Sequence, residues 1–139
     1  MDIPTGYEDL FEDATLAFLA LATVRASGEP VVVPVWFVAD DDGLLFTTEA
    51  DSYKARDIRA RPHVAGVVMA EGEHKRYVSV RGIASEIVDP KSDGIDPVKL
   101  YRRIVQRYEG KDSVESLTDP VFRLIPQRMA GYDYRELDY

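Results

Sequence analysis

The sequence predicts a mainly β fold, in which six antiparallel strands form a barrel or a strongly coiled sheet with two helices. Short apolar runs alternate with turns, and the connections between the first three runs are too short for a crossover helix. Two later segments instead repeat apolar residues at intervals of three and four, which is typical of helices. One helix is expected between the third and fourth strands and the other late in the chain. With 139 residues, we expect a single domain over residues 1–139.

The N-terminal part is expected to form a short helix followed by three strands. Thr5 and Glu8 have the spacing of a capping box, which predicts an amphipathic helix with residues 1–9 as its lead-in. The three apolar runs that follow are residues 18–25, 30–38 and 44–48. Pro34 cannot donate a backbone hydrogen bond, so its nitrogen must face a sheet edge, a bulge or a ligand.

The second half is expected to contain both helices and the remaining strands. The helices are predicted over residues 52–60 and 97–108. The strands are predicted over residues 63–69 and 76–88, with one or two closing strands over 121–125 and 129–134 around Pro126. Gly82 interrupts the long strand where a bulge or a sharp bend would fit. Residues 135–139 are expected to be a loose tail or a partner-binding arm.

Composition excludes several function classes. The formal net charge of −8 would repel nucleic acid, so no nucleic-acid partner is expected. The chain has no cysteine, which excludes disulfides and thiolate chemistry. No apolar run approaches the ~20 residues that cross a bilayer, and the N-terminus lacks a basic leader. We therefore expect a cytoplasmic protein that does not associate with membranes.

The junction between the third strand and the first long helix has the composition of an anion site. Thr47 and Thr48 end the strand, and Ser52, Tyr53 and Lys54 open the helix. A helix N-terminus offers unpaired N–H groups and the positive end of the helix dipole, and a lysine and hydroxyls would complete a phosphate site. The alternative is that Ser52 merely caps a surface helix.

No motif identifies a catalytic residue. Neither histidine, His63 or His74, has a partner at ligand spacing, so no metal site is expected. The sequence lacks a Gly-x-Ser-x-Gly elbow, a Walker loop and a His-Glu-x-x-His motif. If the protein is an enzyme, the chemistry is expected to come from a bound organic cofactor.

Three motifs in order resemble the split-β-barrel flavin-binding proteins, which include the pyridoxamine 5′-phosphate oxidase-like enzymes and their deazaflavin (F420)-dependent relatives. The motifs are Pro-Val-Val-Val-Pro-Val-Trp-Phe from Pro30, Leu-Phe-Thr-Thr-x4-Tyr-Lys-x2-Asp-Ile-Arg-x2-Pro-His-Val from Leu45, and Tyr-Val-Ser-Val-Arg-Gly from Tyr77. The resemblance covers residues 10–132. It implies the FMN-binding type of six-stranded split barrel.

The resemblance also implies a site and an assembly. Such proteins are homodimers with two cofactor sites at the subunit interface. The residues implied to contact the flavin ring or its phosphate are Val33, Pro34, Val35, Trp36, Thr47, Thr48, Ser52, Tyr53, Lys54 and Tyr77. For Trp36, a role as a core or dimer-interface aromatic residue is as well supported as contact with the flavin ring.

The resemblance implies an oxidoreductase that passes hydride through bound FMN, or alternatively F420, to a small substrate. A basic groove for the polyglutamate tail of F420 could come from Arg56, Arg59, Arg61, Lys75 and Arg76. Pyridoxamine phosphate oxidase activity itself is not favoured, because the C-terminal Arg-x-His of those enzymes is absent. A non-catalytic flavin- or deazaflavin-binding protein is the alternative, and a haem-degrading relative on the same barrel ranks third.

Overall fold

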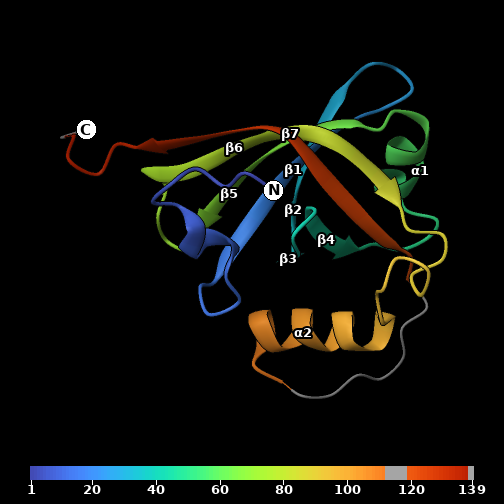
Figure 1. Cartoon of the computed structure of the whole chain (residues 1–139). Coiled ribbons are helices and arrows are strands. Elements are labelled where there is room, and N and C mark those ends of the chain that lie inside the picture. The colour runs from blue at the N-terminus through green and yellow to red at the C-terminus, as the bar shows by residue number, and fades with distance from the viewer. Residues whose placement is uncertain (112–118, 138–139) are drawn as a thin grey trace.

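The computed structural model describes residues 1–111 and 119–137 and consists of one curled antiparallel sheet with two α-helices (Figure 1). The strands are β1 (Ala17–Val24), β2 (Pro30–Val35), β3 (Val38–Ala39), β4 (Leu44–Thr47), β5 (His63–Ala70), β6 (Arg76–Glu86) and β7 (Val121–Asp133). The helices are α1 (Tyr53–Ala60) between β4 and β5, and α2 (Pro97–Glu109) between β6 and β7. A 3₁₀ turn, Glu8–Phe11, precedes β1.

The order of the strands requires the sheet to close on itself. The order is β2-β1-β5-β6-β7-β4-β3, which places β2 at one edge and β3 at the other. Only Trp36 and Phe37 connect these two edges, and a connection of two residues spans at most roughly 10 Å. The sheet therefore curls until its edges approach, as Figure 1 shows. The predicted mainly β split-barrel fold is confirmed, and the position of Pro34 in an edge strand meets the expectation for its nitrogen.

The seventh strand arises because the run predicted over residues 30–38 is interrupted at Trp36 and Phe37. The backbone of Phe37 is bonded to α2 instead of a neighbouring strand. Its N–H donates to the Tyr108 hydroxyl at 3.1 Å, and its carbonyl accepts from Arg107 Nη1 at 2.7 Å. These bonds satisfy the backbone at the point where the chain crosses from one sheet edge to the other.

The capping box predicted at the N-terminus is wrong. Tyr7 is the N-cap of the 3₁₀ turn and makes no side-chain capping bond. The Glu8 carboxylate accepts from Gly6 N–H at 2.8 Å, so it is not available for the reciprocal bond with Thr5. The apolar residues expected to face the core, Leu10 and Phe11, are nevertheless buried.

The long strands β6 and β7 pair along their length, and their register shifts between Arg81 and Gly82. A Cβ at Gly82 would lie 2.2 Å from the Ile125 carbonyl oxygen, so only glycine permits this approach. Pro126 is opposite Gly82 at the irregularity, which explains how β7 continues through a proline. The bulge predicted at Gly82 is confirmed. Of the predicted tail, residues 138–139 lie outside the described residues.

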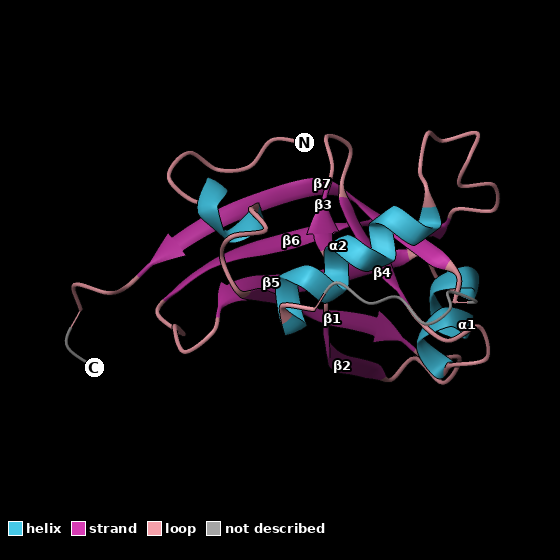
Figure 2. Ribbon diagram, turned by 90° about the horizontal axis from the view of Figure 1, so that it is seen from below, coloured by secondary structure: helices cyan, strands magenta, loops and turns pink. Residues whose placement is uncertain are grey.

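Two apolar cores stabilise the fold. The larger core fills the curled sheet and contains Phe37, Phe46 and Phe122. The smaller core lies beneath α2 and contains Val38, Leu45, Ile87, Leu100, Ile104 and Val121. Figure 2 shows α2 lying across the side of the sheet near β3 and β4. No helix in the described ranges has the length and apolarity needed to span a membrane.

Candidate functional site

A cleft of about 630 Å³ lies where the ends of β2 and β4 meet the first turn of α1 and one face of α2. It is lined by Pro34, Val35, Trp36, Thr47, Lys54, Tyr101, Ile104, Val105, Glu109, Lys111 and Asp119. Five of the ten residues predicted to bind a cofactor are in this list. Strand β2 and the β4–α1 junction belong to two different sequence motifs, and they contribute to one cavity.

Lys54 supplies the cleft with positive charge. Burial lowers the pKa of its ammonium group below the usual range, and the negative charge of Glu49 offsets this only in part. No carboxylate among residues 1–111 and 119–137 forms an ion pair with Lys54. Glu49 and Asp51 are exposed, so their charges remain solvated. A half-buried lysine without a carboxylate partner is a favourable place for a phosphate group.

The N-terminus of α1 lies beside this lysine. Ser52 is the N-cap and accepts a hydrogen bond from Ala55 N–H at 3.1 Å, while Thr48 Oγ1 is 3.1 Å from Ser52 Oγ. Ser52 therefore caps the helix, as the alternative interpretation of this residue expected. Among the described residues, the N–H groups of Tyr53 and Lys54 have no hydrogen-bond acceptor. These two donors and the Lys54 ammonium group can hold an anion together.

Trp36 lines the cleft and has a fixed orientation. Its indole stacks on the Tyr108 ring with centroids 5.0 Å apart and planes 1° apart, and 41% of the residue is exposed. The Tyr108 hydroxyl donates to the Ala17 carbonyl at 2.6 Å and accepts from Phe37 N–H. Helix α2 thus holds an exposed aromatic surface at the cleft, where a planar ring could pack.

The remaining predicted residues are outside the lining. Val33 packs against the main core, and Thr48 and Ser52 form the cap just described. The Tyr53 side chain is 63% exposed and lies between two arginines, with Arg25 at 4.5 Å and Arg56 at 5.8 Å from its ring centroid.

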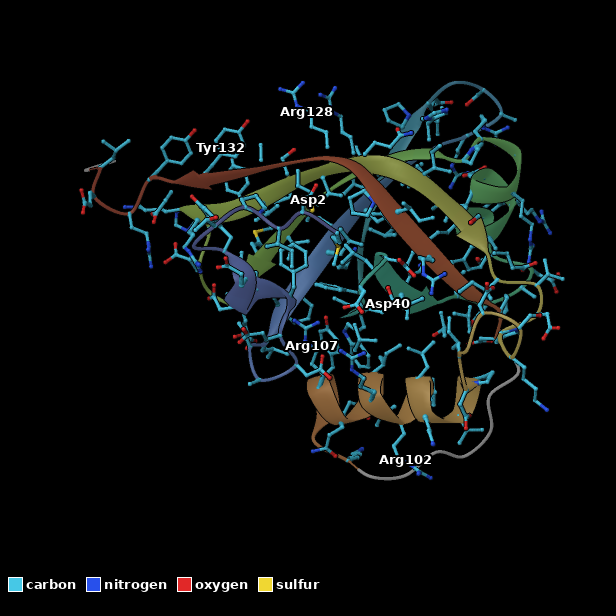
Figure 3. The ribbon with its side chains drawn as sticks, viewed as in Figure 1. Asp2, Asp40, Arg102, Arg107, Arg128 and Tyr132 are labelled. Atoms are coloured by element: carbon cyan, nitrogen blue, oxygen red, sulfur yellow. The ribbon has the colours of Figure 1, made fainter. Side chains whose placement is uncertain are left out.

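Tyr77 is at the opposite end of the sheet from α1. Its ring stacks on Tyr132 at 5.1 Å and lies 6.4 Å from Tyr134. Figure 3 shows Tyr132 on the outer face of β7, near the C-terminal end of the chain and far from α1. Within one chain, the structure does not bring Tyr77 to the cleft.

Sequence reasoning missed the contribution of α2. Tyr101, Ile104, Val105 and Glu109 line the cleft from this helix. The three- and four-residue spacing predicted the helix and its buried face, but that pattern carries no information about which strand ends the helix covers.

Most of the basic residues considered for a groove have other partners. Arg59 pairs with Glu86, Arg61 with Asp57, and Arg76 with Asp9. Lys75 follows the turn before β6, at the Tyr77 end of the sheet. Arg56 forms no ion pair within the described ranges, and neither does Arg25, which the sequence did not single out.

Comparison with known proteins identifies relatives across most of the chain. The family model described as pyridoxamine 5′-phosphate oxidase matches residues 7–132. A pyridoxine/pyridoxamine 5′-phosphate oxidase from Crocosphaera subtropica is 33% identical over 93 residues, covering 62% of this chain. The chain spans less than half of that relative, namely 43% of its length.

Two solved structures have the same fold. An F420 reductase is 32% identical with a TM-score of 0.74, and the match covers 92% of this chain and 98% of that protein. A conserved hypothetical protein from Mycobacterium tuberculosis is 21% identical with a TM-score of 0.76, and the match covers 99% of this chain and 89% of that protein.

Proposed function

The chain belongs to the pyridoxamine 5′-phosphate oxidase family of split β-barrel proteins, and from this we propose that its cleft binds a phosphate-bearing flavin or deazaflavin. We further propose that it is an oxidoreductase acting on a small molecule. The observation that carries the proposal is the half-buried Lys54, without an acidic partner in the described residues, in the same cleft as Trp36. When bound, the cofactor supplies hydride transfer.

The residues of the cleft divide into two parts that fit the two parts of such a cofactor. Lys54 and the first N–H groups of α1 would hold the phosphate, with the Thr47 hydroxyl nearby. Pro34, Val35 and Trp36 would lie along the ring. Pro34 has no N–H group to leave unsatisfied against a planar ring. The protein's part is to position the ring and exclude water from one side of it.

Two observations favour F420 over FMN within this proposal. The F420 reductase matches nearly the whole chain at 32% identity. Beyond Lys54, the helix carries Arg56, whose guanidinium carbon is 5.8 Å from the Tyr53 ring, and Arg25 lies 4.5 Å from the same ring. FMN ends at its phosphate and leaves these arginines unused, whereas the carboxylates of the F420 tail would pair with them.

We also propose a homodimer with cofactor sites at the interface. Tyr77, which the family resemblance assigns to the site, lies at the other end of the sheet and could reach a cleft only in a second copy. Tyr77, Tyr132 and Tyr134 form a tyrosine cluster there, and such residues are enriched in protein interfaces.

The absorbance spectrum of the purified protein tests cofactor identity. We expect a deazaflavin band near about 420 nm after loading with F420, and flavin bands near about 370 and 450 nm if FMN is the cofactor. Oxidation of the reduced cofactor by an added acceptor would indicate an enzyme. Stable binding with no turnover under any donor and acceptor would instead favour the non-catalytic binding protein.

The proposed binding of the F420 tail by Arg25 and Arg56 can be tested separately. Replacing Arg25 and Arg56 together by Gln should weaken F420 binding by about 10-fold or more and leave FMN binding unchanged, because FMN has no tail. Arg59→Gln on the same helix is the control, since that guanidinium is already paired with Glu86. Equal losses for F420 and FMN would contradict the assignment of these arginines to the tail.

A further inference from the structure

Two arginines face each other on the outer surface of the sheet, away from the cleft. Arg81 of β6 and Arg128 of β7 are direct cross-strand partners, and both are exposed. Their strand neighbours Val78 and Val80 point into the core and are fully buried, which fixes the outward direction of Arg81. Figure 3 shows Arg128 standing out from the outer face of β7. Like charges directly opposite each other destabilise a sheet.

This pair differs from the arginines that form ion pairs and shares with Arg25 and Arg56 the lack of a carboxylate partner in the described ranges. Neither Arg81 nor Arg128 forms an ion pair with any residue in the described ranges. The arginines that do pair with Asp or Glu are Arg59, Arg61, Arg76, Arg103, Arg123 and Arg135. Because carboxylates outnumber basic residues in this sequence, 25 to 17, a shortage of acids does not explain the unpaired arginines.

The arginine pair borders a hollow with further hydrogen-bonding groups. A cavity of about 380 Å³ is lined by His63, Val64, Arg81, Gly82, Gln127 and Arg128. It lies at the bulge between β6 and β7, where Gly82 and the Ile125 carbonyl are in close approach. Bulges redirect side chains and occur next to functional sites. Here two arginines, a glutamine and a histidine line one space.

We propose that this hollow, the arginine-pair site, binds a compact dianion of the phosphate type. Two guanidinium groups can each donate paired hydrogen bonds to its oxygens, and the dianion removes the repulsion between them. The site shares no residue with the cleft that contains Lys54. Within one chain it is therefore separate from the cleft, and it lies on the same outer face of β6 as Tyr77, the face that the proposed dimer would turn toward a second copy.

Thermal unfolding with inorganic phosphate tests the proposal. A phosphate concentration ten times the Kd multiplies the folding equilibrium about elevenfold, which raises Tm by about 4 °C for a chain of this size. Sodium chloride at matched ionic strength is needed as the reference, since screening alone weakens the repulsion. The response to phosphate should persist in Lys54→Ala, where the cleft has lost its lysine.

The variant Arg81→Gln/Arg128→Gln should have a Tm no lower than the wild type without phosphate and should respond to phosphate only as it does to chloride. The Arg81 and Arg128 Nε–H signals in ¹⁵N NMR spectra of the wild-type protein should shift on titration, a readout that does not depend on the variant's stability. A wild-type response equal to that of chloride would overturn the proposal. A response that is lost in Lys54→Ala but kept in the arginine variant would place the anion in the cleft and also overturn it.

Discussion

Lys54 lies in an environment that disfavours its charge in the absence of a ligand. Its ammonium group is half-buried in the cleft and has no carboxylate partner among the described residues. Burial of a charge without a partner destabilises the folded protein, so a role in binding explains its position better than a role in folding. The sequence made Lys54 a candidate because it follows a helix cap, and the structure places it in the cleft, but its burial could be learned only from the fold.

Replacing Lys54 by Ala is expected to weaken cofactor binding by about 1.5–3 kcal/mol, or about 10- to 150-fold, because a charge-assisted hydrogen bond to phosphate is lost. Isothermal titration calorimetry with F420 or FMN measures the change. Lys91→Ala, in an exposed loop, is the matched control and should bind as the wild type does. Unchanged affinity in Lys54→Ala would remove this lysine from the site.

The lowered pKa of Lys54 predicts a pH dependence of binding. The charged form holds the phosphate, so cofactor affinity should fall as pH rises through the folded pKa, beginning below the range of an ordinary lysine. A titration series from about pH 7 to about pH 10 should show this loss. Lys54→Arg keeps its charge throughout and should lose less affinity in the alkaline range. Parallel curves for the two proteins would contradict the assignment.

The lowered pKa of Lys54 also determines whether stability rises or falls with pH. Because the folded-state pKa of Lys54 is lower than the unfolded value, the unfolded chain binds more protons as the group titrates. Stability without cofactor should therefore rise with pH through the lysine range by this group's contribution, while affinity for the cofactor falls. These opposite trends distinguish a buried binding lysine from one that forms a stabilising ion pair.

Helix α2 shows where element-level prediction succeeds and where it stops. Its boundaries could be predicted from Pro97 near the start and Gly110 after the end, and the structure confirms both. Its position depends on contacts that are distant in sequence. Arg107 donates to the carbonyls of Leu10, Thr15 and Phe37, and the first of these is 97 positions away. No local pattern reveals such a partner.

Replacing Arg107 by Met is expected to reduce the free energy of unfolding by about 2–4 kcal/mol. Four hydrogen bonds to three carbonyl groups are lost, and at least two of those bonds are buried. Urea unfolding measures the difference. Lys99→Met, at an exposed position on the same helix, is the control and should change stability little. An Arg107→Met protein as stable as the control would show that α2 is held by its apolar face alone.

The errors at the element level have specific causes. The run over residues 30–38 reads as one strand because its residues are uniformly apolar, yet Phe37 bonds to α2 and the chain crosses the barrel there. The capping box failed because Glu8 bonds to Gly6 N–H. In both cases, a backbone or side-chain group of the expected element is bonded to a different partner.

For the whole molecule, the curled sheet determines which residues can share a site. It brings the end of β2 to the β4–α1 junction, and it separates Tyr77, which stacks on Tyr132, from both. The sequence motifs predicted the correct fold and five of the eleven residues that line the cleft, because the family pattern marks these segments. The pattern could not show that Tyr77 lies away from the cleft of its own chain.

Sedimentation equilibrium tests the proposed dimer. We expect a dimer mass, and Tyr77→Ala/Tyr132→Ala should shift the equilibrium toward monomer and weaken cofactor binding together, because both depend on the same interface. Tyr101→Ala, a substitution in the cleft on α2, serves as a control that should not change the mass. A monomer that retains full cofactor affinity would contradict the shared site.

The central claim, that a phosphate-anchored redox ring lies against Trp36 with its phosphate at Lys54, is tested most directly by tryptophan fluorescence. Trp36 is the sole tryptophan of the chain, so its emission reports on this cleft alone. Titration with F420 or FMN should quench the emission to saturation, and the midpoint should move to higher concentration in Lys54→Ala. Unchanged emission at concentrations where ultrafiltration shows the cofactor bound would place the cofactor elsewhere and contradict the account.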